Sequence, residues 1–206
     1  MFPEIISVSP EELSRRQREY GSEAFTEYNL LLGLICNKFL LYNRCLFHGV
    51  AIGVQGNQGW IISAPSGTGK STQYRLLKKL YGERIQLICG DKPILEFQPS
   101  GDIIVHPSPW MGKERWRGKD PAKLSGIIYL KQGQENKIRP MTAAEALIPL
   151  YCQFLYQPEQ EEQLKTVSSM LDCILRQIPV WKLTNKGDEA SAHLLYNTIC
   201  NERNIQ

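Results

Sequence analysis

The sequence has little of what a metal centre or a disulfide framework requires. It contains three histidines, spaced far apart, and six cysteines without a C-x-x-C pair. Because zinc centres are built from clustered cysteine and histidine ligands, the chain offers little material for one. Two of the histidines, His106 and His193, are assigned structural roles. The scattered cysteines favour buried, reduced thiols in a cytoplasmic protein, and a disulfide framework is the alternative.

Long apolar runs and a strong charge of one sign are missing as well. The most apolar window, residues 30–42, is interrupted by Asn37 and Lys38 and is too short to span a bilayer. Residues 1–4 lack the basic-then-apolar order of a secretory leader. The net charge of +3 is too small to predict a nucleic-acid or membrane partner. We therefore expect a cytoplasmic protein, and whether it forms a homo-oligomer stays open.

What the chain does contain is the composition of an ordinary globular domain. Its 206 residues are 42% apolar and 22% charged, which is enough apolar material for a core and argues against disorder. We expect a single domain overall, in which a helical lead over residues 1–44 packs on a P-loop kinase domain with a helical tail over residues 45–206. The grounds for the name of that domain follow below.

Periodicity and turn signals predict the order of the elements. Apolar residues recur at helical spacing within residues 9–43, where Ser9 and Pro10 form a helix-start signal. The centre of the chain is rich in strand signals and the tail in helix signals, which predicts an α/β fold with helices gathered at the chain ends. Strands are predicted over residues 45–54, 60–64, 84–89, 94–97, 103–106, 124–130 and 180–183, and later helices over 73–80, 142–156, 159–177 and 187–200.

One stretch carries the strongest functional signal. A β-rich apolar run over residues 60–64 leads into a turn of small residues, and a helix-like segment follows. A strand, a glycine-rich turn and a helix in this order are typical of a P-loop, in which backbone amides and the positive end of the helix hold phosphate. The phosphate-binding candidates are Ser66, Gly67, Thr68, Gly69, Lys70, Ser71 and Thr72.

Two of these residues have a further predicted role. Lys70 is placed to reach the β- and γ-phosphates of a nucleotide, and the Ser71 hydroxyl is placed to ligate Mg²⁺. The pattern G-x-x-x-x-G-K-S has Ala64 at its first position, a small residue that fits the same turn. A glycine-rich turn before an ordinary helix is the alternative interpretation.

His48 and Asp91 are candidates for chemistry beside the loop. If the hairpin turn centres near Asn57, antiparallel pairing places His48 opposite Ser66, next to bound phosphate. Asp91 follows a strand that we expect to adjoin the P-loop strand, where a carboxylate can meet Mg²⁺ or accept the proton of an attacking hydroxyl. The alternatives are a core histidine with satisfied hydrogen bonds and an aspartate that caps the turn before Pro93.

Together these segments resemble the HPr kinase/phosphorylase family. That family has a His-Gly strand, then a Gly-x-Ser-Gly-x-Gly-Lys-Ser loop, then an aspartate pair after the following strand, and the counterparts here are residues 47–52, 63–72 and 88–91. The loop is also similar to that of ATP-dependent phosphoenolpyruvate carboxykinase, which shares the nucleotide-binding core. The resemblance covers about residues 45–131 and implies a P-loop fold whose mixed β-sheet core is flanked by helices.

Carried over by position, the resemblance implies a role for each matching residue. His48 matches the active-site histidine of the family, Lys70 and Ser71 match its phosphate and metal contacts, and Asp91 matches one aspartate of the pair. The resemblance therefore implies ATP and Mg²⁺ as cofactors. It makes Asp91, His48 and Lys70 the catalytic residues and Ser71 and Asp91 the metal ligands.

Three features depart from the family pattern. The first aspartate of the pair is replaced by Gly90, no acidic metal ligand is found securely before residues 126–128, and the family's N-terminal domain is replaced by the short helical lead. These departures bear on reversibility and regulation more than on the use of ATP. The chain resembles small stand-alone members of the superfamily, some of which are similar to kinases that act on serine in peptides of modification pathways.

A proline- and glycine-rich segment over residues 108–119 carries two tryptophans and four basic residues. We interpret it as a mobile segment that closes over phosphate or peptide, where a basic side chain would neutralise charge on the transferred phosphoryl group and Glu114 would bind metal. A solvated loop anchored by tryptophan is one alternative, and a stacking surface for nucleic acid is a weaker one. The candidates in this segment are Lys113, Glu114, Arg115 and Arg117.

The sequence as a whole predicts an ATP-dependent phosphotransferase similar to HPr serine kinase. The expected acceptor is the hydroxyl of a serine in a protein or peptide substrate, which Asp91 would orient or deprotonate with support from His48. Two alternatives stay open. One is a kinase that acts on a small molecule, and the other is a catalytically weak ATP-binding regulatory protein, which Gly90 favours.

Overall fold

The computed structural model describes residues 7–20, 22–54, 57–158 and 160–201, so parts of three predictions, at residues 1–4, 55–56 and 159, lie outside the described residues. The described helices are α1 (Pro10–Tyr20), α2 (Glu23–Leu40), α3 (Lys70–Tyr81), α4 (Ala143–Tyr151), α5 (Glu161–Gln177) and α6 (Glu189–Asn201), with a 3₁₀ turn over Gly82–Arg84. The described strands are β1 (Arg44–Phe47), β2 (Val50–Val54), β3 (Gln58–Ser63), β4 (Ile85–Cys89), β5 (Ile94–Phe97), β6 (Ile103–His106), β7 (Ala122–Gln132), β8 (Lys137–Pro140), β9 (Phe154–Leu155) and β10 (Val180–Asn185). The predicted α/β class is confirmed.

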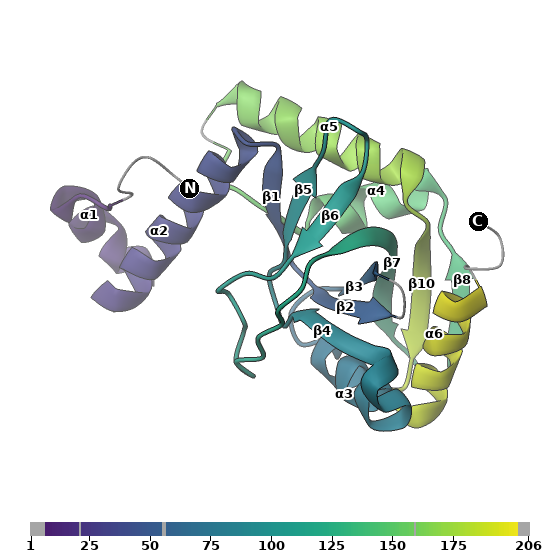
Figure 1. The fold of residues 1–206 in the computed structure, drawn as a ribbon. Coiled ribbons are helices and arrows are strands. Elements are labelled where there is room, and N and C mark those ends of the chain that lie inside the picture. Colours follow the sequence, from purple (N-terminus) through teal and green to yellow (C-terminus); the bar gives the residue numbers. More distant parts are fainter. Residues whose placement is uncertain (1–6, 21, 55–56, 159, 202–206) are drawn as a thin grey trace.

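Helices cover both faces of one mixed sheet, as Figure 1 shows. α4 and α5 pack on the face that carries Ile61, and α3 and α6 pack on the face that carries Trp60 and Ile62. Successive residues of β3 therefore alternate between two cores, as the two-residue repeat of a strand requires. Burial on both faces explains why this strand is a continuous apolar run, and it holds the loop after β3 at the end of the sheet.

The strands follow the order β4-β2-β3-β7-β6-β5-β1-β9, with β10 beside β7 and β8 beside β10. β7 runs parallel to β3 and to β10, and the other pairs are antiparallel. The strand before Asp91, β4, pairs with β2 and does not adjoin β3, the strand before the predicted phosphate-binding loop, so that prediction is wrong. The reason is the hairpin: β2 occupies one edge of β3 and offers its own outer edge to β4.

The predicted strand over residues 45–54 is two strands in the structure. β1 pairs with β5 and β9, whereas β2 pairs with β3 and β4, so the chain changes partners at His48 and Gly49. A Cβ atom at Gly49 would lie 2.6 Å from Cγ2 of Ile61. Glycine therefore allows the chain to cross close to β3 at this point.

The hairpin register differs from the predicted one by two residues. Val50 pairs with Ile62, and the same register continued along the chain brings His48 level with Ala64, where Ser66 was predicted. The last pair of the hairpin is Val54 with Gln58, and residues 55–56 of the predicted turn lie outside the described residues. His48 still reaches the loop, because its backbone oxygen accepts a hydrogen bond from the Ser63 hydroxyl at 2.8 Å.

The C-terminal half contains two strands that sequence patterns do not predict. The helix predicted over residues 142–156 ends at Tyr151, and the chain then forms β9 against β1. β8 is a short polar strand that pairs with β10 alone, so it has no buried face to produce an apolar alternation. The remaining predicted strands are confirmed, and β7 extends to Ala122–Gln132 where residues 124–130 were predicted.

The N-terminal helices project from the body of the molecule (Figure 1). α1 packs against α2, and α2 packs on β1 and α5, where Cys36 and Phe39 form a small core with Leu46. The predicted helix start is confirmed, since Ser9 Oγ accepts a hydrogen bond from the Glu12 amide at 3.2 Å. No helix in the described ranges is long and apolar enough to cross a membrane. All six cysteines fall within those ranges, and none forms a disulfide.

Candidate functional site

A cavity of about 1050 Å³ lies where β3 and β4 end, and it brings together segments that are far apart in the sequence. Ten residues that the sequence predicts for the site line this cavity. Seven are catalytic or phosphate-binding candidates, and three are candidates of the 108–119 segment. These are Ser66, Gly67, Gly69, Lys70, Ser71, His48 and Asp91, with Lys113, Glu114 and Arg115.

Three predicted residues do not line this cavity. The Thr68 hydroxyl donates a hydrogen bond to the backbone oxygen of Pro65 at 2.9 Å, and Thr72 is exposed on the first turn of α3. Arg117 forms an isolated β-bridge with Cys89.

The turn after β3 has the conformation of a backbone cradle. Gly67 and Gly69 have φ angles of 79° and 107°, a left-handed region that glycine adopts without steric cost. Gly69 is the N-cap of α3, and no side chain caps the first amides of that helix. These amides, which lack partners within the helix, carry the partial positive charge that binds anions.

Lys70 adds a buried positive charge to the cradle. Its side chain is largely buried, and Nζ donates hydrogen bonds to the backbone oxygens of Ala64 at 2.9 Å and Pro65 at 3.2 Å. Burial lowers the pKa of the Lys70 ammonium, while Asp91 acts in the opposite direction. A buried ammonium that is held by neutral backbone oxygens gains stabilisation from an anion placed beside it.

His48 and Asp91 meet at the opposite wall. His48 Nε2 lies 3.6 Å from Asp91 Oδ1, and the Lys92 ammonium contacts Asp91 Oδ2. Burial lowers the pKa of His48, and the charge of Lys70 lowers it further, while Asp91 opposes both. The Asp91 backbone oxygen accepts a hydrogen bond from the Gly49 amide at 2.8 Å, which ties this carboxylate to the crossing between β1 and β2.

Residues 107–121, which we call the strap, form the outer wall of the cavity. On one side the strap is attached to β4 and the residues after it: the Lys92 amide donates to the backbone oxygen of Trp110 at 3.3 Å, and Ser108 Oγ lies 3.5 Å from Cys89 Sγ. At Gly118 a Cβ atom would lie 2.1 Å from the backbone oxygen of Ile88, so glycine is required for this close approach.

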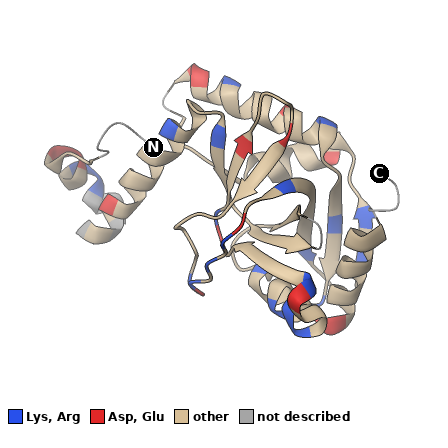
Figure 2. Ribbon diagram, viewed as in Figure 1, with Lys and Arg blue, Asp and Glu red and all other residues tan. Residues whose placement is uncertain are grey.

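On the other side the strap is attached to α3. The Trp116 ring lies 4.9 Å from the Tyr74 ring, and the Arg75 guanidinium lies 5.0 Å from the centre of the same Trp116 ring. Arg75 also pairs with Glu114 at 3.5 Å. Where the sequence suggests a mobile segment, the structure shows one that is tethered at several points. Figure 2 shows that basic residues occur along both α3 and the strap.

Several cavity residues carry no signal in the sequence. Tyr28 reaches the cavity from α2, and Lys92 lines it beside Asp91. Gln153, which follows α4, lies against the His48 ring. Their positions depend on how distant elements pack together, and no local pattern reports that.

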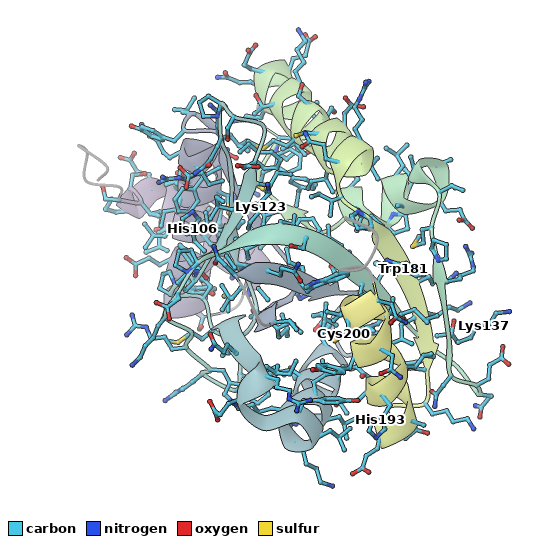
Figure 3. The ribbon with its side chains drawn as sticks, turned by 45° about the vertical axis from the view of Figure 1, so that its right-hand side comes forward. His106, Lys123, Lys137, Trp181, His193 and Cys200 are labelled. Atoms are coloured by element: carbon cyan, nitrogen blue, oxygen red, sulfur yellow. The ribbon has the colours of Figure 1, made fainter. Side chains whose placement is uncertain are left out.

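The remaining histidines are outside the cavity lining. His106 on β6 lies 2.7 Å from Glu96, and His193 on α6 lies 2.6 Å from the Tyr81 hydroxyl. Figure 3 shows that these two histidines lie on different parts of the molecule. Both make the local contacts expected of structural residues.

The predicted magnesium ligands, Ser71 and Asp91, both lie in the cavity lining. In the described part of the chain, no group of three or more His, Cys, Asp or Glu residues is placed to hold a metal ion. Mg²⁺ in phosphate sites keeps several waters and takes one or two protein oxygens together with phosphate oxygens. Ser71 and Asp91 both line the cavity and fit that smaller requirement, with Glu114 as a further carboxylate.

No protein-family model matches the chain, and no curated protein matches its sequence. Among solved structures, the chain is similar to the HPr(Ser) kinase/phosphatase from Coxiella burnetii, with a TM-score of 0.44 and 15% sequence identity over 77% of this chain and 95% of that chain. This is a distant structural likeness.

Proposed function

We propose that the protein is an ATP-dependent kinase that moves the γ-phosphate of ATP to a hydroxyl group. The observation that supports this is the content of a single cavity: a glycine cradle at an uncapped helix start, the buried Lys70, and Asp91 beside His48. The first two features suit a polyphosphate anion. The third suits an acceptor whose proton must be removed.

In this proposal the triphosphate lies along residues 66–71, where backbone amides and Lys70 offset its charge. When bound, Mg²⁺ supplies charge neutralisation on the phosphate oxygens, and Ser71 and Asp91 are the residues that would hold it. Asp91 orients the acceptor hydroxyl and takes its proton as the new oxygen–phosphorus bond forms. The bond between the γ-phosphorus and the bridging oxygen breaks, and ADP leaves.

The proposed acceptor is a serine of a protein or peptide. Tyr28, Trp110 and Met111 are among the lining residues and give the cavity a partly apolar wall. A peptide side chain can pack on such a wall while its hydroxyl reaches Asp91. A small-molecule acceptor is the second candidate, and the cytoplasm is the proposed location.

A catalytically weak ATP-binding regulatory protein is the third candidate. Asp91 is in contact with Lys92, and the position before it is Gly90, so only one carboxylate stands where the resembled family has two. With the Lys92 ammonium as its partner and no second carboxylate beside it, Asp91 alone would have to serve both the metal and the acceptor hydroxyl.

The test is transfer from γ-labelled ATP to serine-containing proteins, peptides and small alcohols. Lys70→Ala should lose nucleotide binding, whereas Asp91→Asn should keep binding and lose transfer by about 10²-fold or more. Lys79→Ala, at an exposed position of α3 paired with Glu189, is the matched control and should behave as wild type. Undiminished transfer in both site variants would reject the assignment. Tight binding of Mg-ATP without any transfer would favour the regulatory candidate.

A further inference from the structure

The chain after α4 reaches the candidate site through a strand of two residues. β9 pairs with β1 in the register Phe47 to Phe154. One step further along, the His48 amide donates to the backbone oxygen of Gln153 at 2.8 Å. Gln153 is only 3% exposed, and its side chain lies against the His48 ring. The short strand thus brings a buried amide group from the C-terminal half to the catalytic candidate.

The hydrogen bonds of Gln153 define which end of its amide faces the ring. Nε2 of Gln153 donates to the backbone oxygen of Pro149 at 3.2 Å, and a carbonyl oxygen accepts only from a donor. The other end, Oε1, lies 3.2 Å from His48 Nδ1. Because an amide oxygen is an acceptor only, Nδ1 must carry the ring proton.

The second ring nitrogen is then determined as well. In a neutral imidazole only one nitrogen is protonated, so Nε2 of His48 has a free lone pair. It faces Asp91 Oδ1 at 3.6 Å. The charged groups that act on the ring are Lys70, Asp91 and Lys92. Nε2 of His48 and Oδ1 of Asp91 are therefore both hydrogen-bond acceptors, and the place beside them suits a group that donates a hydrogen bond.

We propose that Gln153 is a positioning residue, which holds His48 in the Nδ1–H tautomer and so keeps Nε2 and Asp91 Oδ1 both open to a donor. In the other tautomer, Nε2–H would donate to Oδ1 and occupy the carboxylate oxygen that an acceptor hydroxyl has to meet. The proton on Nδ1 follows from the two hydrogen bonds of Gln153. The consequence for catalysis is that the site selects a substrate with a neutral hydroxyl group over a substrate whose attacking oxygen is an anion. This consequence rests on the proposed kinase function.

The tautomer is measured directly by nuclear magnetic resonance. The full chain is labelled with ¹⁵N-histidine, and long-range ¹H–¹⁵N correlations are recorded at neutral pH without nucleotide, with His48→Asn used to assign the signals. Wild type should show a protonated Nδ1 and an unprotonated Nε2. Gln153→Leu should shift His48 to Nε2–H, whereas Gln153→Glu, which keeps an acceptor opposite Nδ1, should retain Nδ1–H. Gln177→Leu, at an exposed position of α5, is the matched control.

An Nε2–H signal in wild type, or an unchanged Nδ1–H signal in folded Gln153→Leu, would overturn the proposal. If Gln153→Leu does not fold, the spectra of wild type and Gln153→Glu decide the question. In transfer assays, Gln153→Leu should lower kcat by about 10²-fold with KM for ATP unchanged, and Gln153→Glu should recover part of the loss. Absence of transfer in wild type would reject the kinase function, while the spectra would still decide the tautomer.

Discussion

Gly90 lies directly against the backbone of Trp116. A Cβ atom on Gly90 would come within 3.0 Å of the Trp116 backbone oxygen and 3.2 Å of Trp116 Cβ, and within 3.0 Å of the Met111 backbone oxygen. The sequence resemblance implies an aspartate of a pair at this position, where the chain has glycine. In this chain the strap packs here on the end of β4, so a side chain at this position would have to push the strap outward.

We predict that Gly90→Asp does not add a second catalytic carboxylate. The new side chain should displace the strap, because both nearest neighbours include backbone atoms that cannot rotate away. Overpacking of this kind lowers the free energy of unfolding by about 1–3 kcal/mol. Urea unfolding and limited proteolysis at the basic residues of the strap would measure the effect.

The control for this substitution is Gly53→Ala on β2. A Cβ atom at Gly53 meets nothing nearer than 3.7 Å, so this variant should be as stable as wild type or slightly more stable. If Gly90→Asp showed increased phosphoryl transfer and normal stability, the proposed relation between Gly90 and the strap would be wrong.

The attachment of the strap to α3 gives a second prediction. Trp116→Ala removes the ring that contacts both Tyr74 and Arg75, and leaves Arg75 paired with Glu114 alone. Ring contacts of this kind contribute about 1–2 kcal/mol to holding the strap in place. If the strap covers the phosphates, the loss of this energy should weaken the binding of Mg-ATP about tenfold. Calorimetry measures this, with the exposed Tyr42→Ala as control. Unchanged affinity would mean that the strap does not cover the nucleotide.

Much of the fold could be predicted because the necessary information is local. The strands β5 and β6 and the turn between them follow from apolar runs interrupted by Pro99 and Gly101, and the loop after β3 follows from its glycines. His48 and Asp91 were predicted beside that loop, and the cavity contains both, although their predicted roles remain proposals.

What could not be predicted depends on pairing partners that are distant in the sequence. β9 exists because β1 offers a free edge, and residues 154–155 alone are compatible with a continued helix. Gln153 and Tyr28 reach the site only through the packing of β9 and α2. The order β4-β2-β3 depends on which edge of the hairpin stays free, and a list of strands does not contain that information.

The start of α4 gives a prediction of pH dependence. The Glu145 carboxylate accepts hydrogen bonds from Arg139 at 2.7 and 3.0 Å and from the Thr142 amide at 3.0 Å, and these contacts hold its pKa at about 2. A carboxylate whose folded pKa is depressed stabilises the fold above its unfolded pKa of 4.5, and this contribution is lost as the pH falls towards 2.

Glu145→Gln should therefore lower the urea midpoint at pH 7, and its difference from wild type should close between pH 4.5 and about 2. Glu161→Gln, which removes an exposed pair with Lys165 on α5, is the control and should change little at either pH. A constant difference across the pH range would show that the Glu145 charge is not responsible.

A buried polar contact between α3 and the C-terminal half gives the last prediction. Gln73 on α3 is fully buried, and its Nε2 donates to Asn185 Oδ1 at 3.1 Å and to Ser191 Oγ at 2.6 Å. Asn185 Nδ2 in turn donates to the backbone oxygen of Lys131 at 3.2 Å. Asn185→Leu leaves one donor of Gln73 without its partner in a buried position, which costs about 1–3 kcal/mol of unfolding free energy.

Because α3 begins at the proposed phosphate cradle, Asn185→Leu should also weaken Mg-ATP binding although the residue does not line the cavity. Urea unfolding and calorimetry on the same samples separate the two effects. The matched control is Asn197→Leu, at an exposed position of α6, which should alter neither quantity. If Asn185→Leu lowered stability but bound Mg-ATP as wild type does, the contact would support the fold without holding α3 in the orientation that the cradle needs.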